Sequence, residues 1–96
     1  MIKVVRNKNI ITISGHANYK KSNDIVCAFV SGVMYTTVNA ILSINKDYIN
    51  YDDNNDKVII TILSDDTTTK KLIDNMLKMF NELSKDYPNN IKVKEE

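Results

Sequence analysis

The chain has few of the residues that cross-link a fold or hold a metal. Among its 96 residues are one cysteine, Cys27, and one histidine, His16, so an internal disulfide and every zinc site built from several cysteines are excluded. It has two glycines and one proline, and no linker, repeat or low-complexity segment interrupts it. We expect no cofactor and no metal. Catalysis by a soft nucleophile or a near-neutral base must therefore use Cys27 and His16.

The chain also lacks a dominant charge. Thirteen Lys and Arg residues against twelve Asp and Glu residues leave a net charge of +1, and these charges are scattered. Proteins that bind nucleic acid or anionic lipid need a clustered basic surface, so we expect neither partner. No apolar run approaches the roughly 18 residues of a membrane span, and the N-terminus lacks the apolar stretch of a signal peptide. We therefore expect a cytoplasmic protein without membrane contact.

Length and composition indicate one globular domain spanning residues 1–96. Apolar residues make up 43% of the chain and charged residues 26%, which is typical of a soluble domain. A chain of this length buries roughly 60–65% of the surface that it exposes when unfolded. That is enough for a modest core and a small cleft.

The spacing of apolar residues predicts the element order β-β-α-β-β-α-β. Two hairpins are expected from polar turns between short β-branched runs, and two helices from apolar residues that recur every three or four positions after capping residues. The expected elements are strands 2–6 and 10–14, a helix over 25–44, strands 48–51 and 58–63, a helix ending before Pro88, and an edge strand at 91–93. The predicted class is α/β (α+β), with a mixed sheet packed against two helices. The strand at 58–63 is apolar on both faces and is expected inside the sheet.

The first helix has an unusually wide apolar stripe. Besides residues at helical spacing, Ile25, Met34, Val38 and Leu42 extend the stripe around the helix. This width predicts a helix that is covered on more than one side. The sheet is one expected cover, and a second subunit is the other.

Cys27 and His16 can meet at the start of this helix. Cys27 follows the expected cap, Asp24, by three residues, in the first turn, where free backbone N–H groups and the helix dipole stabilise a thiolate. His16 lies eleven residues before Cys27, and the loop 17–23 is long enough to fold back. Such a pair suffices for nucleophilic acyl transfer, with the N–H groups of Cys27 and its neighbours as an oxyanion hole. The alternatives are a small buried Cys27 and a surface His16, and spacing alone does not decide between them.

Two short motifs around this pair resemble a known family. Residues 15–17 (Gly-His-Ala) and 24–31 (Asp-Ile-Val-Cys-Ala-Phe-Val-Ser) resemble the signature of the ribosomal-processing cysteine proteases, the Prp family. The resemblance covers essentially the whole chain. It implies a homodimeric cytosolic endopeptidase that removes an N-terminal extension from ribosomal protein twenty-seven of the large subunit. Cys27 would be the nucleophile and His16 the general base, beside an apolar substrate groove.

Further residues of the motifs have alternative roles. Asp24 either caps the helix or orients His16, and the Ser31 hydroxyl either faces the cleft or bonds back to a helix carbonyl. The resemblance makes Gly15 and Ala28 supporting residues as well. The acidic segment 52–56 is interpreted as a solvated hairpin turn.

The chain departs from the family pattern in its loop. Ser22 replaces a glycine two residues before the aspartate, and the loop between His16 and Cys27 is one residue shorter. Serine lacks the easy access of glycine to positive φ, so loop closure is expected to differ. The rival hypothesis is therefore a non-catalytic, ribosome-associated protein-binding module on the same scaffold. A thiol redox sensor is a weaker alternative because the chain has no second cysteine.

Overall fold

The predicted elements are all present. The structure, a computed structural model, describes residues 1–96. Its elements are β1 (Ile2–Asn7), β2 (Ile10–Ser14), α1 (Ile25–Ile44), β3 (Ile49–Asp53), β4 (Lys57–Ile62), α2 (Thr67–Asp86) and β5 (Ile91–Glu95). The order β-β-α-β-β-α-β and the α/β class are therefore confirmed.

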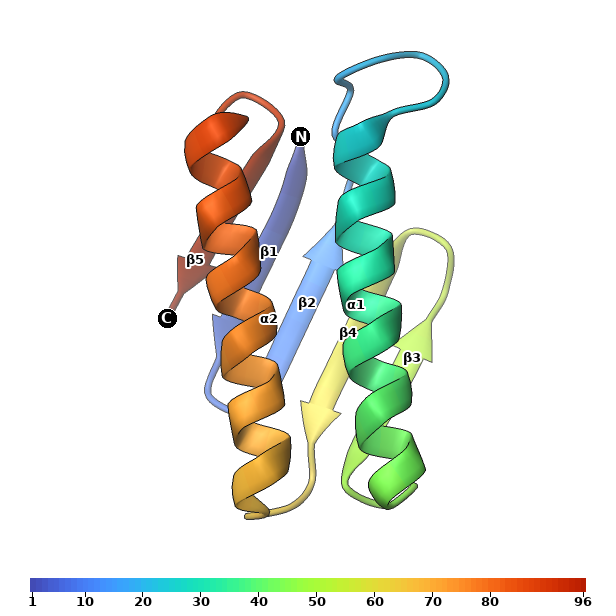
Figure 1. Cartoon of the computed structure of the whole chain (residues 1–96), viewed down its shortest axis with the longest axis vertical. Coiled ribbons are helices and arrows are strands. Elements are labelled where there is room, and N and C mark those ends of the chain that lie inside the picture. Colours follow the sequence, from blue (N-terminus) through green and yellow to red (C-terminus); the bar gives the residue numbers. More distant parts are fainter.

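The five strands form one mixed sheet in the order β3-β4-β2-β1-β5. The β1–β5 pair is parallel and the other three pairs are antiparallel. β4 lies between β3 and β2, as its apolar sequence predicts, but it ends at Ile62, and Leu63 is 60% exposed. Both helices pack on the same face of the sheet (Figure 1). The opposite face carries no second layer, so Ile59 of β4 is only half-buried there.

The core lies between the helices and the sheet. α2 is one-sided and buries Ile73, Met76, Leu77 and Phe80, which recur every three or four residues. Eighteen apolar residues are buried in all. Phe80 is completely buried, so its truncation to alanine is expected to cost about 3–5 kcal/mol.

α1 is only partly covered within one chain. Its inner side buries residues such as Val26, Val30 and Val38, but Phe29 is 39% exposed and Ile25 is 54% exposed. Within one chain, only the inner side of α1 is covered, by the sheet and by α2. The outer side carries apolar residues that no part of the chain contacts closely.

α1 as a whole is more apolar than its separate apolar runs indicate. The helix has 20 residues and a mean hydropathy of 1.8 over an 18-residue window, so its length and composition are those of a membrane span. The reason is that polar residues such as Thr36 and Asn39 interrupt its apolar runs, yet none of its residues is charged. The core helix of a soluble protein can satisfy the same criterion, and a third of this window is buried in the fold.

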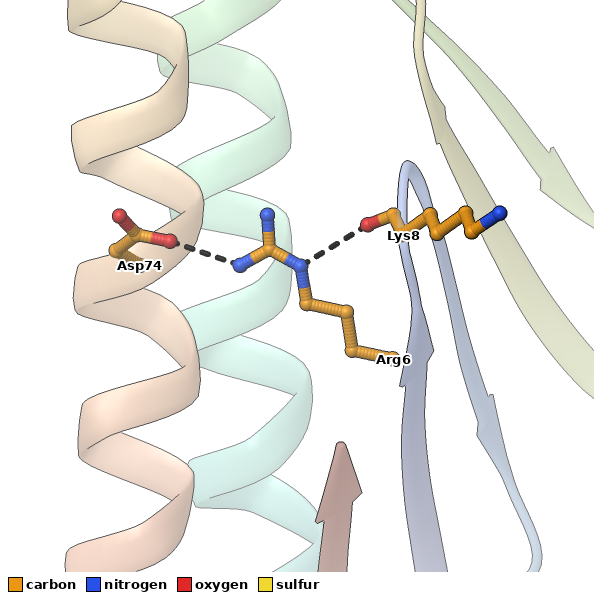
Figure 2. Close-up of polar contacts among 3 residues, drawn as sticks. All are labelled: Arg6, Lys8 and Asp74. Carbon is orange, nitrogen blue, oxygen red and sulfur yellow. Dashed lines mark hydrogen bonds and ion pairs between the residues drawn. The ribbon is translucent and has the colours of Figure 1, made fainter. Parts of the chain in front are cut away.

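An ion pair joins the end of β1 to α2. The Arg6 guanidinium donates from one nitrogen to Asp74 Oδ1 at 2.8 Å and from its Nε to the Lys8 carbonyl at 3.1 Å (Figure 2). Lys8 adopts a positive φ of 55° in the turn between β1 and β2. Arg6 therefore links this turn to the middle of α2. The pair is partly exposed, so its contribution to stability is small, about 0–1 kcal/mol.

Candidate active site

A cleft of about 200 Å³ opens between α1, the end of β2 and the turn between β3 and β4. Its walls combine apolar residues of the core with polar residues at the rim. The lining residues are Ile2, Ile13, Ser14, Gly15, His16, Cys27, Val30, Ser31, Met34, Tyr35, Asp53, Asn55, Asp56, Lys57 and Val58. The only cysteine and the only histidine of the chain thus border one cleft.

Cys27 is half-buried in the first turn of α1 and packs against the core. The backbone N–H of Ala17 donates to its Sγ at 3.4 Å. His16 is exposed and directly precedes Ala17, so the turn that carries the imidazole lies against the sulfur. The fold-back of the loop that the sequence predicts is therefore confirmed. Ala17 therefore places a backbone N–H donor directly beside Sγ.

Asp24 caps α1 and also holds the loop. Its Oδ1 accepts from the N–H groups of Val26 (3.0 Å) and Cys27 (3.1 Å), and its Oδ2 accepts from those of Tyr19 (3.0 Å) and Lys20 (3.3 Å). Burial by itself would raise the pKa of the Asp24 carboxyl, but the N–H groups of these four residues together lower that pKa below its ordinary value. The capping role is confirmed. No hydrogen bond joins Asp24 to His16, so the alternative of an orienting carboxylate is not supported.

The predicted oxyanion hole is wrong in this geometry. The N–H groups of Val26 and Cys27 donate to the Asp24 carboxylate, and that of Ala28 donates to the Asp24 carbonyl at 3.0 Å. The sequence argument fails because the residue that begins the helix also occupies the donors of its first turn. The N–H group beside the sulfur belongs to Ala17 instead.

The other motif residues take different positions around the cleft. Gly15 has a φ of +85°, and a Cβ at this position would clash with the carbonyl oxygen of Met1. Ser31 follows Cys27 by one turn and lines the cleft. The hydroxyls of Thr37 and Ser43 bond back to helix carbonyls, but that of Ser31 does not, which favours its cleft-facing alternative. Ala28 is exposed, and its side chain does not line the cleft.

The loop reaches its shape without the family glycine. Asn18 and Asn23 have φ values of +56° and +54°, whereas Ser22 does not adopt a positive φ. Asparagine tolerates this left-handed region better than other residues that carry a side chain. The positive φ that glycine would adopt easily at position 22 is thus adopted by the neighbouring residue, Asn23.

The opposite rim of the cleft was not predicted. Asp53 ends β3, Asp56 lies in the turn and Lys57 begins β4, a segment that the sequence indicates only as a solvated hairpin turn. The missing information is the β2–β4 pairing, which places Lys57 opposite Ser14, one residue from the Gly-His-Ala turn. No local pattern specifies that pairing.

A tyrosine pair extends this rim. Tyr35 lies two turns after Cys27 on α1, and its ring packs edge-on against Tyr51 with centroids 6.5 Å apart. Burial and the neighbouring Tyr35 and Asp53 raise the pKa of the Tyr51 phenol. The phenol therefore keeps its proton and donates to Asp53 Oδ2 at 3.3 Å. This contact holds the Asp53 side chain at the rim.

Comparisons with known proteins identify the family of this chain. The sequence matches the family described as cysteine protease Prp over residues 1–92. It is 32% identical over 87 residues to the ribosomal processing cysteine protease Prp of Staphylococcus aureus strain Mu50, covering 86% of this chain and 82% of that protein.

The fold is similar to crystal structures of the essential ribosomal processing protease Prp from S. aureus. One is a complex with a covalently linked product peptide, with a TM-score of 0.88 and 28% identity, and the other is a complex with a substrate peptide, with a TM-score of 0.83 and 26% identity. Both similarities cover 100% of each chain. The chain therefore belongs to the Prp family of cysteine proteases and is a peptide hydrolase.

Proposed function

We propose that this protease removes the N-terminal extension of a large-subunit ribosomal protein, ribosomal protein twenty-seven. Cys27 is the nucleophile and His16 the general base. The observation that carries these roles is the 3.4 Å contact from the Ala17 N–H to Cys27 Sγ, because it ties the His16 turn to the sulfur within one cleft. The S. aureus relative is a ribosomal processing protease, which supports the substrate class.

The reaction is an acyl transfer in two stages. The His16 imidazole takes the proton of the Cys27 thiol, and the thiolate attacks the scissile carbonyl. The peptide C–N bond then breaks, and the imidazolium donates its proton to the leaving amine. Water, deprotonated by His16, hydrolyses the thioester and regenerates the thiol. The covalently linked product peptide in the S. aureus structure is consistent with such a nucleophile.

The remaining motif residues support the site. Asp24 positions the start of α1 and the loop, Gly15 permits the turn before His16, and Ser31 presents its hydroxyl to the cleft. The apolar walls of the cleft, which include Val30, are suited to the apolar residues expected before the cleavage point.

The alternative of a non-catalytic binding module is not favoured. A module of that kind needs no nucleophile, whereas the family is one of cysteine proteases and an S. aureus structure holds a covalently linked product. The departure at Ser22, which motivates the alternative, is compensated by Asn23.

The decisive experiment mixes the purified protein with a precursor of ribosomal protein twenty-seven that carries its extension. Intact mass is read for the wild type, for Cys27→Ala and for a matched control, Ser43→Ala, which removes a small polar group at the far end of α1. A single cut by the wild type and the control, but not by Cys27→Ala, supports the proposal. Cleavage by Cys27→Ala would refute the nucleophile. An intact precursor that co-purifies with all three proteins would favour the binding module.

The role of His16 has its own test. Because Cys27 is the only thiol, its alkylation by iodoacetamide reports on this one site. We expect His16→Ala to slow peptide cleavage and to move the pH midpoint of alkylation upwards, because the proposed base that takes the thiol proton is removed. An unchanged pH profile would contradict the assigned pair.

We further propose that the protein is a homodimer in the cytoplasm. The exposed apolar residues Ile25 and Phe29 on α1 support a second copy as the cover of this face. Sedimentation of the purified protein tests the oligomeric state. Fractionation of cells tests the location, and recovery in the membrane fraction would contradict it.

A further inference from the structure

A side chain from the far end of the sequence reaches the active-site loop. Asn90 precedes β5, and its Nδ2 donates to the carbonyl of Ala17 at 3.0 Å across 73 residues of sequence. The two loops that meet here, before α1 and after α2, lie at the same end of the molecule (Figure 1). The contact is part-buried and joins segments that no strand or helix otherwise connects.

The backbone of Asn90 is held on both sides. Its N–H donates to the Tyr87 carbonyl at 3.0 Å, and its own carbonyl accepts from the N–H of Ile2 at 2.8 Å. The side-chain amide therefore starts from a fixed point beside β1. A donor that is anchored in this way can define the position of its acceptor.

The acceptor, Ala17, is the residue that contacts the nucleophile. It is 1% exposed, its carbonyl accepts from Asn90, and its N–H donates to Cys27 Sγ at 3.4 Å. Ala17 thus lies between two side chains that hold it from opposite ends. The loop has a second tie nearby, where the rings of Tyr19 and Tyr87 pack edge-on with centroids 5.2 Å apart.

We propose that Asn90 is a positioning residue for the nucleophile. By holding the Ala17 carbonyl, it keeps the Ala17 N–H directed at Cys27 Sγ and keeps the adjacent His16 turn over the cleft. Asn90 touches neither the sulfur nor the substrate, so it acts through Ala17. The inference rests on the proposed role of Cys27 as the nucleophile.

The chemistry of the amide explains why this position needs an asparagine. Removing the side chain leaves the part-buried Ala17 carbonyl without its donor, and the residue then moves to find another partner. An aspartate has the same shape but cannot donate when ionised. In both cases the N–H beside the sulfur is no longer fixed, and thiolate formation becomes less favourable.

The test measures the alkylation of Cys27 by iodoacetamide as a function of pH in the full-length protein. We expect Asn90→Ala to react about three- to tenfold more slowly at pH 7, the effect of one lost hydrogen bond, with a midpoint at higher pH. Asn89→Ala, at the neighbouring exposed position, is the matched control and should behave as wild type. The titratable groups that border the site, His16, Asp24, Tyr35, Asp53, Asp56 and Lys57, are unchanged in both variants.

Peptide cleavage provides the second readout. A positioning role predicts that Asn90→Ala has a lower kcat and a nearly unchanged KM. A loss of folding alone would lower the fraction of active protein and leave the alkylation profile of the folded protein unaltered. If Asn90→Ala does not fold, Asn90→Asp keeps the side-chain shape and is expected to show the same slow alkylation. A wild-type alkylation profile in a folded Asn90 variant would overturn the inference.

A failure of the positioning role of Asn90 can be distinguished from a failure of the proposed function. If the wild type alkylates normally but cleaves no precursor, the proposed substrate fails and the effect of Asn90 on alkylation is still measured. If the wild type cleaves and the Asn90 variants match it in both readouts, only the positioning role fails.

Discussion

Replacing Gly15 with alanine should disturb both stability and activity. Gly15 has a φ of +85°, in the left-handed region that glycine alone adopts without cost. An added Cβ would also clash with the carbonyl oxygen of Met1 and lie 3.4 Å from the Met1 carbonyl carbon. Both obstacles are backbone features, so no side-chain rotation relieves them.

The expected loss is the sum of two effects. A left-handed conformation costs a residue with a Cβ about 1–2 kcal/mol. Moving the N-terminal strand to relieve the clash costs about 1–2 kcal/mol more, as does other overpacking. At about 5 °C per kcal/mol for a domain of this size, Tm should fall by roughly 10–20 °C. Because His16 follows directly, cleavage should slow even where the variant is folded.

Gly32 supplies the matched control. It lies inside α1, and an added Cβ would meet no atom within 4 Å. Alanine in a helix is favoured over glycine by about 0.5–1 kcal/mol, so Gly32→Ala should raise Tm by a few degrees. Thermal unfolding followed by circular dichroism measures both variants. A Gly15→Ala protein that is as stable and as active as wild type would refute the account of this turn.

Three further predictions test the cap, the ion pair and the outer face of α1. Folding lowers the pKa of Asp24 below its ordinary value of 3.8, so its carboxylate stabilises the fold fully above that pH. The Tm advantage of wild type over Asp24→Asn should therefore be full at pH 6 and should be lost as the pH falls through the lowered pKa. Asp74→Ala should lower the free energy of unfolding by less than about 1 kcal/mol in urea titrations, since Arg6 keeps its bond to the Lys8 carbonyl. Phe29→Asp should convert a dimer into monomers, as measured by sedimentation. The control Asn39→Asp adds the same charge to α1 at an exposed polar position and should leave the dimer intact. A dimeric Phe29→Asp protein would place the interface elsewhere.

The elements of this fold could be predicted because their signals are local. Asp24 before an apolar run marks the start of α1, and the turn chemistry at 7–9 marks the first hairpin. The strand order could not be predicted in the same way. The parallel β1–β5 pair and the β2–β4 pair join segments far apart in sequence, and tertiary packing rather than local preference selects them.

The same division applies to the site. The sequence places Cys27 and His16 in one cleft because their motif is contiguous with a helix start, and the 3.4 Å contact of Ala17 agrees with the expected fold-back. The oxyanion donors were assigned wrongly because Asp24 both identifies the helix start and occupies its N–H groups. The rim at Asp53 and the contact of Asn90 were missed because each depends on a long-range pairing.

Asp24 also shows how the loop can move without unfolding the helix. Its two carboxylate oxygens are divided, since Oδ1 accepts only from α1 and Oδ2 accepts only from the loop residues Tyr19 and Lys20. If the loop opens to admit a peptide, the bonds to Oδ2, the contact of the Ala17 N–H with Cys27 Sγ and the ties at Tyr87 and Asn90 are lost, while Oδ1 continues to cap the helix below Cys27. The backbone of Cys27 therefore stays in place on α1, and only the N–H donor beside its sulfur depends on the position of the loop. This division explains why a shorter loop without the family glycine is compatible with the same site: α1 fixes the backbone of Cys27, and the loop, through Ala17, sets the surroundings of its sulfur.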